Sequence, residues 1–192
     1  NGISVNAVKM NVLYVGVDNP IEIYAAGRNA DELLVDLEGG SLLKTSTGHY
    51  NAKVNAVGPC TLVVSQSVAG VKMVLGKYTF KAKRLPDPQA MLGGMLRGGK
   101  APTEKILSMK SVVPMLLLFD FDADFQVKSF TLSIISDGKI TSAETKGSVF
   151  SKEMKELINS AKTGDLVVVQ DIMVEWPDKS SKEINALVVK VE

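Results

Sequence analysis

Short strand-like runs follow one another through the first 85 residues, and this pattern restricts the fold more than any other feature of the 192-residue sequence. There are roughly seven runs in about 80 residues, with turn residues about every 8 to 12 positions. No long helical period appears among them. The pattern is typical of an immunoglobulin-like β-sandwich. The runs cover residues 7–14, 21–24, 33–35, 42–45, 50–54, 60–65, 71–75 and 78–83.

Two prolines, Pro86 and Pro88, end this pattern. Prolines one residue apart cannot continue a central strand, and they hold the chain extended. The charge balance changes at the same place, because residues 1–85 hold 9 basic and 6 acidic side chains whereas residues 86–192 hold 13 and 15. We therefore expect two domains, an immunoglobulin-like β-sandwich over 1–85 and a β-rich domain over 86–192.

The second domain is predicted to be α+β, with a sheet that carries one amphipathic helix. The alternation within residues 125–136 slips near Ser129, which indicates a bulge. Asp137 and Gly138 then form a dipeptide that favours a two-residue hairpin turn. Strand patterns cover residues 111–121, 125–136, 139–145, 165–176 and 183–191.

The one expected helix lies near residues 151–162. Ser151 is a suitable N-cap, apolar residues recur at helical spacing after it, and Gly164 is expected to stop the helix. Residues 89–97 are rich in Met, Leu and Gly, and fit either a short helix or a flexible segment. The pattern of residues 103–108 is ambiguous.

Composition excludes several functional classes. The 22 basic residues nearly balance the 21 acidic ones, so no net field attracts nucleic acid or an anionic membrane. Aromatic residues are only 6%, which is too few for a base-stacking platform. No run approaches the roughly 18 apolar residues that cross a bilayer. The first ten residues lack the features of a signal peptide, and we expect a mature protein or an excised piece.

The sequence motifs that could indicate catalysis or metal binding each lack residues that the motif requires. The residues Asp120, Asp122 and Asp124 have the spacing of a calcium loop, but Phe125 stands where glycine is required and Leu132 where a bidentate glutamate is required. A solvated turn or strand edge is favoured for this acidic segment over a weak ion site or a catalytic role. We expect no catalytic, metal-binding or cofactor-binding residues in this chain.

For three further features a structural role is favoured over a functional one. His49 follows a turn and has no hydrolytic partner motif, so a surface histidine is expected. Cys60 lies in a strand pattern and has no second cysteine to pair with, so a buried apolar role is expected. The glycines before Lys100 resemble a phosphate loop, but Ala101 and Pro102 replace the hydroxyl residue and the helix start, which favours a flexible loop.

Methionine is concentrated around the start of the second domain, where four of the eight residues lie within 25 positions of one another: Met91, Met95, Met109 and Met115. Such side chains pack in cores more often than they form adaptable binding surfaces, and both alternatives stay open here. Trp176, at the end of a strand pattern, is likewise expected to pack in the core rather than anchor an interface.

Three phrases of the sequence resemble a known family. They read NVLYVGVDNPI at residues 11–21, FKAKRLPDP at 80–88, and FDFD at 119–122 followed by FQV at 125–127 and SF at 129–130. In this order they are similar to the C-terminal periplasmic half of the GldM/PorM family, which belongs to the gliding-motility and type IX secretion machinery of Bacteroidota. The resemblance covers essentially the whole chain.

The resemblance implies a non-catalytic module that transmits force and binds other proteins. Family members are homodimers that an N-terminal helix anchors in the inner membrane, where they work with a motor partner. Their distal periplasmic domains contact a ring formed by an outer-membrane lipoprotein and its periplasmic companion. The anchor and the helical domain beside it are absent from this sequence. The same resemblance implies neither a cofactor nor nucleic acid as a ligand.

Candidate interface residues follow from these readings. The first group is Met91, Met95 and Arg97, and the second is the acidic set Asp120, Asp122 and Asp124. The motif that carries the resemblance is expected to be an architectural turn rather than a contact; its residues are Tyr14, Gly16, Asp18, Asn19 and Pro20. A carbohydrate-binding β-sandwich is the alternative function, and it would require a row of exposed aromatic side chains.

Overall fold

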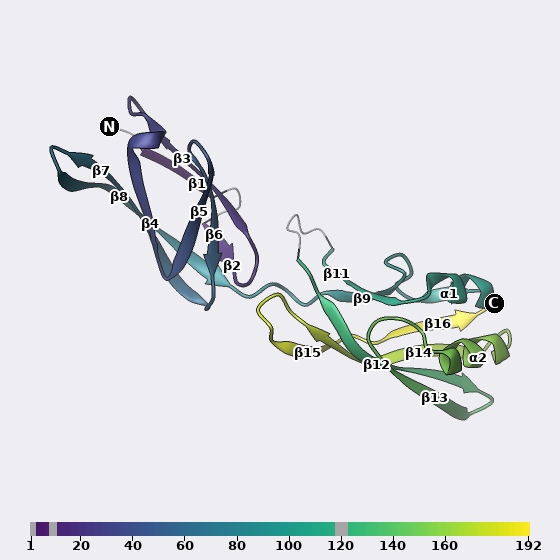
Figure 1. Cartoon of the computed structure of the whole chain (residues 1–192). Helices are drawn as coiled ribbons and strands as arrows, with labels where there is room; N and C mark the ends of the chain where they lie inside the picture. The colour runs from purple at the N-terminus through teal and green to yellow at the C-terminus, as the bar shows by residue number, and fades with distance from the viewer. Residues whose placement is uncertain (1–2, 8–10, 118–122) are drawn as a thin grey trace. The chain divides into compact units, whose positions relative to one another are not determined.

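The computed structural model describes residues 3–7, 11–117 and 123–192 (Figure 1). The chain divides into two compact units, Asn1–Leu85 and Pro86–Glu192. Strands dominate both units, and the two α-helices of the described chain lie in the second. The expected mainly β fold with a helix-containing second domain is confirmed.

The first unit is a sandwich of two four-stranded sheets. One sheet has the order β1-β3-β6-β5 and the other has the order β2-β8-β7-β4. Taken in chain order, these are the A-B-E-D and G-F-C sheets of an immunoglobulin fold, with β2 added beside the last strand. Their bounds are β1 Ile3–Ala7, β2 Val12–Tyr14, β3 Asn19–Ala25, β4 Leu33–Glu38, β5 Gly40–Ser46, β6 His49–Val54, β7 Gly58–Val68 and β8 Val71–Lys83, with a short 3₁₀ turn η1 at Ala30–Glu32.

The core of this sandwich forms where alternating apolar residues of both sheets meet. Ile21 and Ile23 of β3 face Leu62 and Val64 of β7, and all four are fully buried. Cys60 joins the same cluster, and its Sγ donates to the Phe80 carbonyl oxygen at 3.7 Å. Burial raises the pKa of this thiol. The expected buried, apolar role of Cys60 is therefore confirmed.

The strands expected in this unit differ from the structure in two places. Residues 7–14 were expected to form one strand, but β1 and β2 belong to different sheets, and residues 8–10 between them lie outside the described residues. Alternation alone cannot reveal that a chain changes sheets. In contrast, residues 71–75 and 78–83 join into the single strand β8, which a bulge opposite Val64 and Ser65 interrupts.

The second unit is built on a sheet with the order β10-β16-β14-β12-β13, in which β15 also pairs with β14. A separate two-stranded sheet pairs β9 with β11. The strand bounds are β9 Gln89–Leu92, β10 Gly99–Ala101, β11 Val112–Met115, β12 Gln126–Ser136, β13 Lys139–Lys146, β14 Leu166–Glu175, β15 Ser181–Ile184 and β16 Leu187–Val191.

The central hairpin of this sheet follows the sequence closely. β12 and β13 pair antiparallel, with Ser136 opposite Lys139. Asp137 and Gly138 between them have φ of 49° and 76°, the left-handed conformation that this two-residue turn needs. The register of β12 against β14 shifts on both sides of Ser129. Both the turn and the bulge are confirmed.

Two helices, rather than the expected one, cover this unit. α1 (Thr103–Met109) forms in the segment whose pattern was ambiguous, and it contacts α2 (Lys152–Ser160). Ser151 caps α2 as expected, since its Oγ accepts from the Met154 N–H at 3.2 Å. The prediction that Gly164 stops this helix was wrong. Ala161 already has an extended backbone, and Gly164 N–H donates to the Val191 carbonyl at 2.8 Å.

The segment 89–97 is neither of the two structures expected for it. Its first part is strand β9, paired with β11, and its second part is a tight loop. Four residues are too few for a strand pattern to be distinguished from a short helix. The strand expected over 111–121 is limited to β11 within the described residues, and residues 118–122 lie outside them.

Candidate interaction surfaces

The carboxamide of Asn19 is the centre of the family-motif turn. The residue is only 1% exposed. Its Oδ1 accepts from the Tyr14 N–H at 2.6 Å, and its Nδ2 lies 2.9 Å from the Tyr14 carbonyl, 3.0 Å from that of Val17 and 3.2 Å from that of Ala52. Tyr14 belongs to one sheet and Ala52 to the other. The side chain of Asn19 therefore joins the two sheets, which supports an architectural role for the turn.

The other motif residues shape the same turn. Gly16 has φ of 83°, a conformation that favours glycine, and its N–H donates to the Val54 carbonyl at 3.2 Å. Asp18 is exposed, and its carboxylate lies 3.1 Å from the Lys53 Nζ. Pro20 is exposed and pairs opposite Asn51 of β6. Only Asp18 and Pro20 present much of their side chains to solvent.

The segment after β9 displays one methionine and buries another. Met91 is 7% exposed, so its side chain is not available on the surface of this unit, whereas Met95 is 72% exposed. Leu92 N–H donates to the Leu96 carbonyl at 2.8 Å, and Leu96 N–H donates back to Leu92 at 3.0 Å. These bonds close a tight loop with Met95 in it. Arg97, just beyond the loop, is also exposed.

The other two methionines support this loop. A Cβ added at Gly93 would meet the Met109 Sδ at 2.9 Å, and one added at Gly94 would meet the Met115 Sδ at 3.4 Å. Met109 is half-buried and Met115 is exposed. The four methionines thus differ in exposure, and Met95 and Met115 are the two that are exposed to solvent.

Of the acidic candidates, the structure places only Asp124. This residue is exposed, and its carboxylate accepts from the Gln126 Nε2 at 3.3 Å. Asp120 and Asp122 lie outside the described residues.

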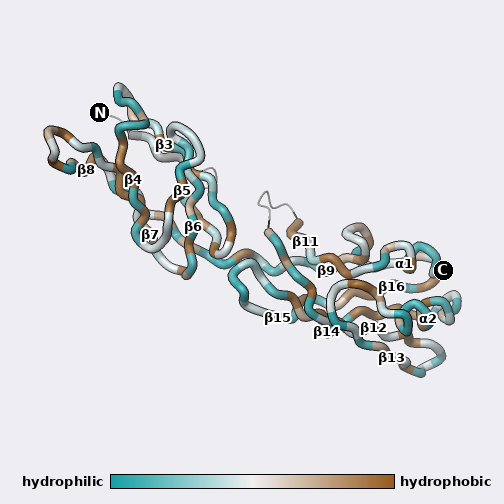
Figure 2. Tube along the Cα trace, viewed as in Figure 1, coloured by the Kyte–Doolittle hydropathy of each residue, from teal (hydrophilic) through white to brown (hydrophobic). Residues whose placement is uncertain are grey.

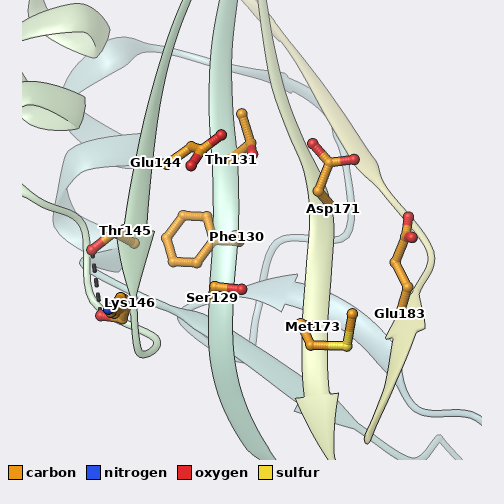
Figure 3. A pocket seen from close by; sticks show the side chains of 9 residues that line it. All are labelled: Ser129, Phe130, Thr131, Glu144, Thr145, Lys146, Asp171, Met173 and Glu183. Atoms are coloured by element: carbon orange, nitrogen blue, oxygen red, sulfur yellow. Dashed lines mark hydrogen bonds between the residues drawn. The ribbon is translucent and has the colours of Figure 1, made fainter.

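A second acidic feature, which the sequence patterns did not indicate, is a shallow hollow of about 710 Å³ over the sheet. Glu144, Asp171 and Glu183 reach it from β13, β14 and β15, with Lys146 and Met173 also in the lining (Figure 3). The three carboxylates are 12 to 39 residues apart in the sequence, so only the strand order brings them together. Within the described part of the chain, no group of three or more metal-ligating side chains is placed to hold an ion.

The remaining sequence candidates have structural roles. His49 begins β6 beside a turn, and its Nδ1 lies 3.7 Å from the Glu22 Oε1. Lys100 lies in β10, which pairs with β16, so the glycine-lysine segment is not a phosphate loop, and the prediction of a flexible loop there was wrong. Trp176 is buried, with its ring edge-on to Phe125 at a centroid distance of 5.5 Å.

Two observations bear on the wider class of the protein. Among the described aromatic residues, Tyr24 alone is strongly exposed, so a row of rings for stacking on sugars is absent from this part of the chain. None of the helices in the described ranges is long and apolar enough to cross a membrane.

One cluster of exposed apolar side chains was not anticipated from the sequence. It lies at the end of the β7–β8 hairpin, where part of the tube is coloured hydrophobic in Figure 2. Its members are exposed by 44% to 64%: Leu34, Val68, Val71, Met73 and Val74. The signal that could have revealed it is the run 68–75, in which Lys72 is the only charged residue.

We expect Asn19→Ala to lower the free energy of unfolding of the first domain by about 3 kcal/mol, because three carbonyls and one N–H lose their buried partner. Asn19→Asp should cost more at neutral pH, since a carboxylate would face those three carbonyls. The denaturant dependence of Cys60 thiol labelling measures this unfolding, because the buried thiol reacts when the domain opens. The exposed Asn55→Ala is the control, and an equal loss there would contradict the role given to Asn19.

The stability of the second domain should fall in acid through Glu175. Its carboxylate lies 3.0 Å from the Lys128 Nζ and 3.3 Å from the Lys179 Nζ, and these bonds hold its pKa below the ordinary value of 4.5. The unfolded chain therefore binds the proton more readily. The contribution is present above pH 4.5 and is lost as the pH falls through the lower folded-state pKa.

Glu175→Gln should consequently flatten the pH dependence of unfolding below pH 4.5. The fluorescence of Trp176, the single tryptophan, measures unfolding of this domain in denaturant titrations. Glu104→Gln, a change at an exposed glutamate of the same domain, is the matched control. A Glu175→Gln profile that overlays the wild-type profile would show that the ion pairs contribute nothing to stability.

Comparison with known proteins agrees with this two-unit architecture. The family model described as the GldM third domain matches residues 2–83, and the model described as the GldM C-terminal domain matches residues 86–192. A search of curated proteins gave no match. The two family matches are consecutive and together span nearly the whole chain. The chain belongs to the GldM family, a component of the gliding-motility and type IX secretion machinery.

Proposed function

We propose that this chain is a non-catalytic, force-transmitting interaction module in the periplasmic part of a membrane-anchored, homodimeric motor protein. In this role it contacts ring components associated with the outer membrane. The family assignment supports the proposal, because GldM C-terminal domains are periplasmic parts of membrane-anchored proteins. The observation that carries the force-transmitting role is the parallel pairing of β2 with β8.

The parallel pair joins β2, near the start of the first domain, to the end of β8, its last strand. Val12, Leu13 and Tyr14 pair with Lys81, Ala82 and Lys83. Lys81 N–H donates to the Asn11 carbonyl at 3.0 Å, and Val15 N–H donates to the Lys83 carbonyl at 2.9 Å. The chain reaches β2 from β1, which pairs with β3 in the other sheet, and it leaves after β8. Tension that reaches β2 therefore pulls these parallel strands in opposite directions along their axes.

Such a geometry resists force better than its few bonds suggest. Parallel strands have evenly spaced bonds, and a load along the strand axis strains all of them at once rather than opening them one after another. The Asn19 carboxamide adds hydrogen bonds to the N–H and to the carbonyl oxygen of Tyr14, at the end of β2. The bonds between β2 and β8 can thus carry tension through the first domain.

The surface proposed for the ring contact is the Met95 loop of the second domain. Met95 and Arg97 are exposed beside Met115, and backbone bonds hold the loop in one conformation. Methionine suits an adaptable apolar contact, and a fixed loop loses little entropy on binding. Asp124 is the other exposed candidate in this domain.

The load-bearing role can be tested by pulling single molecules between the two ends of the chain. Lys81→Pro removes the N–H that donates to Asn11, so the first domain should unfold at clearly lower force than in the wild type. Lys77→Pro is the matched control in the same strand, at a position that the β2 pairing does not reach. Equal unfolding forces for the two variants would contradict the clamp.

The ring contact can be tested with the full chain as bait in an envelope extract of the source organism. We expect recovery of an outer-membrane lipoprotein and its periplasmic companion, with roughly tenfold less recovered by Met95→Glu, since one buried charge in an apolar contact costs more than 1.4 kcal/mol. Ile140→Glu, at another exposed apolar residue of the domain, is the control. Failure to recover either protein from an extract shown to contain both would remove this part of the proposal.

A further inference from the structure

We propose that the open edge of β8 in the first domain, Val71–Lys77, binds an extended acidic segment of a partner protein as an added β-strand. This contact is separate from the one proposed for the second domain and does not depend on it. The argument rests on three features of the hairpin: an unpaired strand edge, exposed apolar side chains on both of its faces, and a charge of one sign.

The edge is open because β2, the neighbour of β8 on the side away from β7, is short. β7 pairs with β8 along its whole length, but β2 covers only Lys81–Lys83 on the other side. Between Val71 and Lys77, no strand in the described part of the chain pairs with that second edge. In Figure 1 the β7–β8 hairpin extends past the end of β4. Natural proteins usually cover or shorten such an edge, so an open one is a site for strand addition.

The ladder also shows which backbone groups face the open side. Val68 and Val71 flank the two-residue turn and form a hydrogen-bonded pair, so Lys72 and Val74 direct their N–H and C=O groups away from β7. The bulge at Leu75 shifts this alternation by one residue. Lys77 then faces outward, in phase with Lys81, whose N–H donates to Asn11 in β2. Lys72, Val74 and Lys77 are thus the outward-facing residues.

Apolar side chains on both faces of the hairpin give an added strand something to pack against. Val71 and Met73 lie on the face that continues the sandwich core, and Val74 lies on the opposite face in line with Leu34 of β4. These four are exposed by 44% to 64%. An added strand with apolar residues at alternate positions would cover part of this area.

Charge selects the partner. β8 contains four lysines, at positions 72, 77, 81 and 83, and no acidic residue, and β7 contains no charge at all. Lys72 is paired with Asp36 at 2.6 Å, whereas no ion pair of Lys77 occurs in the described structure. A second copy of the chain would bring lysines against lysines, which destabilises cross-strand pairing. An acidic strand would instead place carboxylates beside them.

The test uses the full chain and a synthetic peptide about nine residues long, long enough to span the open edge, that alternates valine or threonine with glutamate. We expect binding by the glutamate peptide that is at least roughly tenfold tighter than binding by the same peptide with lysine in place of glutamate. Lys77→Ala should weaken binding a few-fold, because only the charge is lost. Lys77→Pro should weaken it at least about tenfold, because the outward N–H is lost as well.

Hydrogen exchange on the wild-type chain gives a readout that does not depend on any variant folding. Binding of the glutamate peptide should slow exchange at the amides of Lys72, Val74 and Lys77, as strand addition requires. Peptide binding without protection of these amides would overturn the proposal, and so would equal binding of the lysine peptide. Protection that appears with rising protein concentration and no peptide would also overturn it, in favour of a second copy of the chain.

Discussion

The buried amide of Asn19 fixes the point at which the chain of the first domain passes between its two sheets. One carboxamide satisfies the Tyr14 peptide in one sheet and the Ala52 carbonyl in the other. β2 has only three residues, and the bonds from Asn19 to Tyr14 hold its last residue opposite Lys83 of β8. β2 covers only Lys81–Lys83, and no strand in the described part of the chain pairs with Val71–Lys77 on that side. The parallel clamp and the open edge therefore lie on the same side of β8.

β8 consequently divides into two parts with different physical roles. Its last three residues pair with β2 and, in the proposed role, bear load along their axis, whereas its first seven have a strand neighbour only on the β7 side within the described part of the chain. The bulge at Leu75 separates the parts and changes which backbone groups face outward. A strand added at the open edge would extend the sheet without touching the bonds between β2 and β8. Binding and load-bearing can thus coexist in one strand.

Features that depend on a few adjacent residues could be predicted from the sequence, whereas features that depend on strand pairing between distant residues could not. Asp137-Gly138 and Ser151 are recognisable because a tight turn and a helix cap depend on a few adjacent residues. The distinction between Met91 and Met95 depends on pairing with β11, more than 20 residues away, so no local pattern contains it. The same holds for Glu144, Asp171 and Glu183, which only the order of β13, β14 and β15 brings to one hollow. The helix α1 was missed because seven residues give too little periodicity.

The lysines of β8 explain how an apolar open edge can avoid pairing with a copy of itself. Charged residues on an edge strand oppose pairing with identical edges, and a bulge opposes it further because it breaks a continuous register. β8 has both devices within the open segment, in Lys72 and Lys77 and in the bulge at Leu75. The lysine charges penalise a second copy of the same strand but become attractive for an acidic strand. Discrimination by charge therefore protects the edge from self-association while it keeps the edge available to a partner of opposite charge.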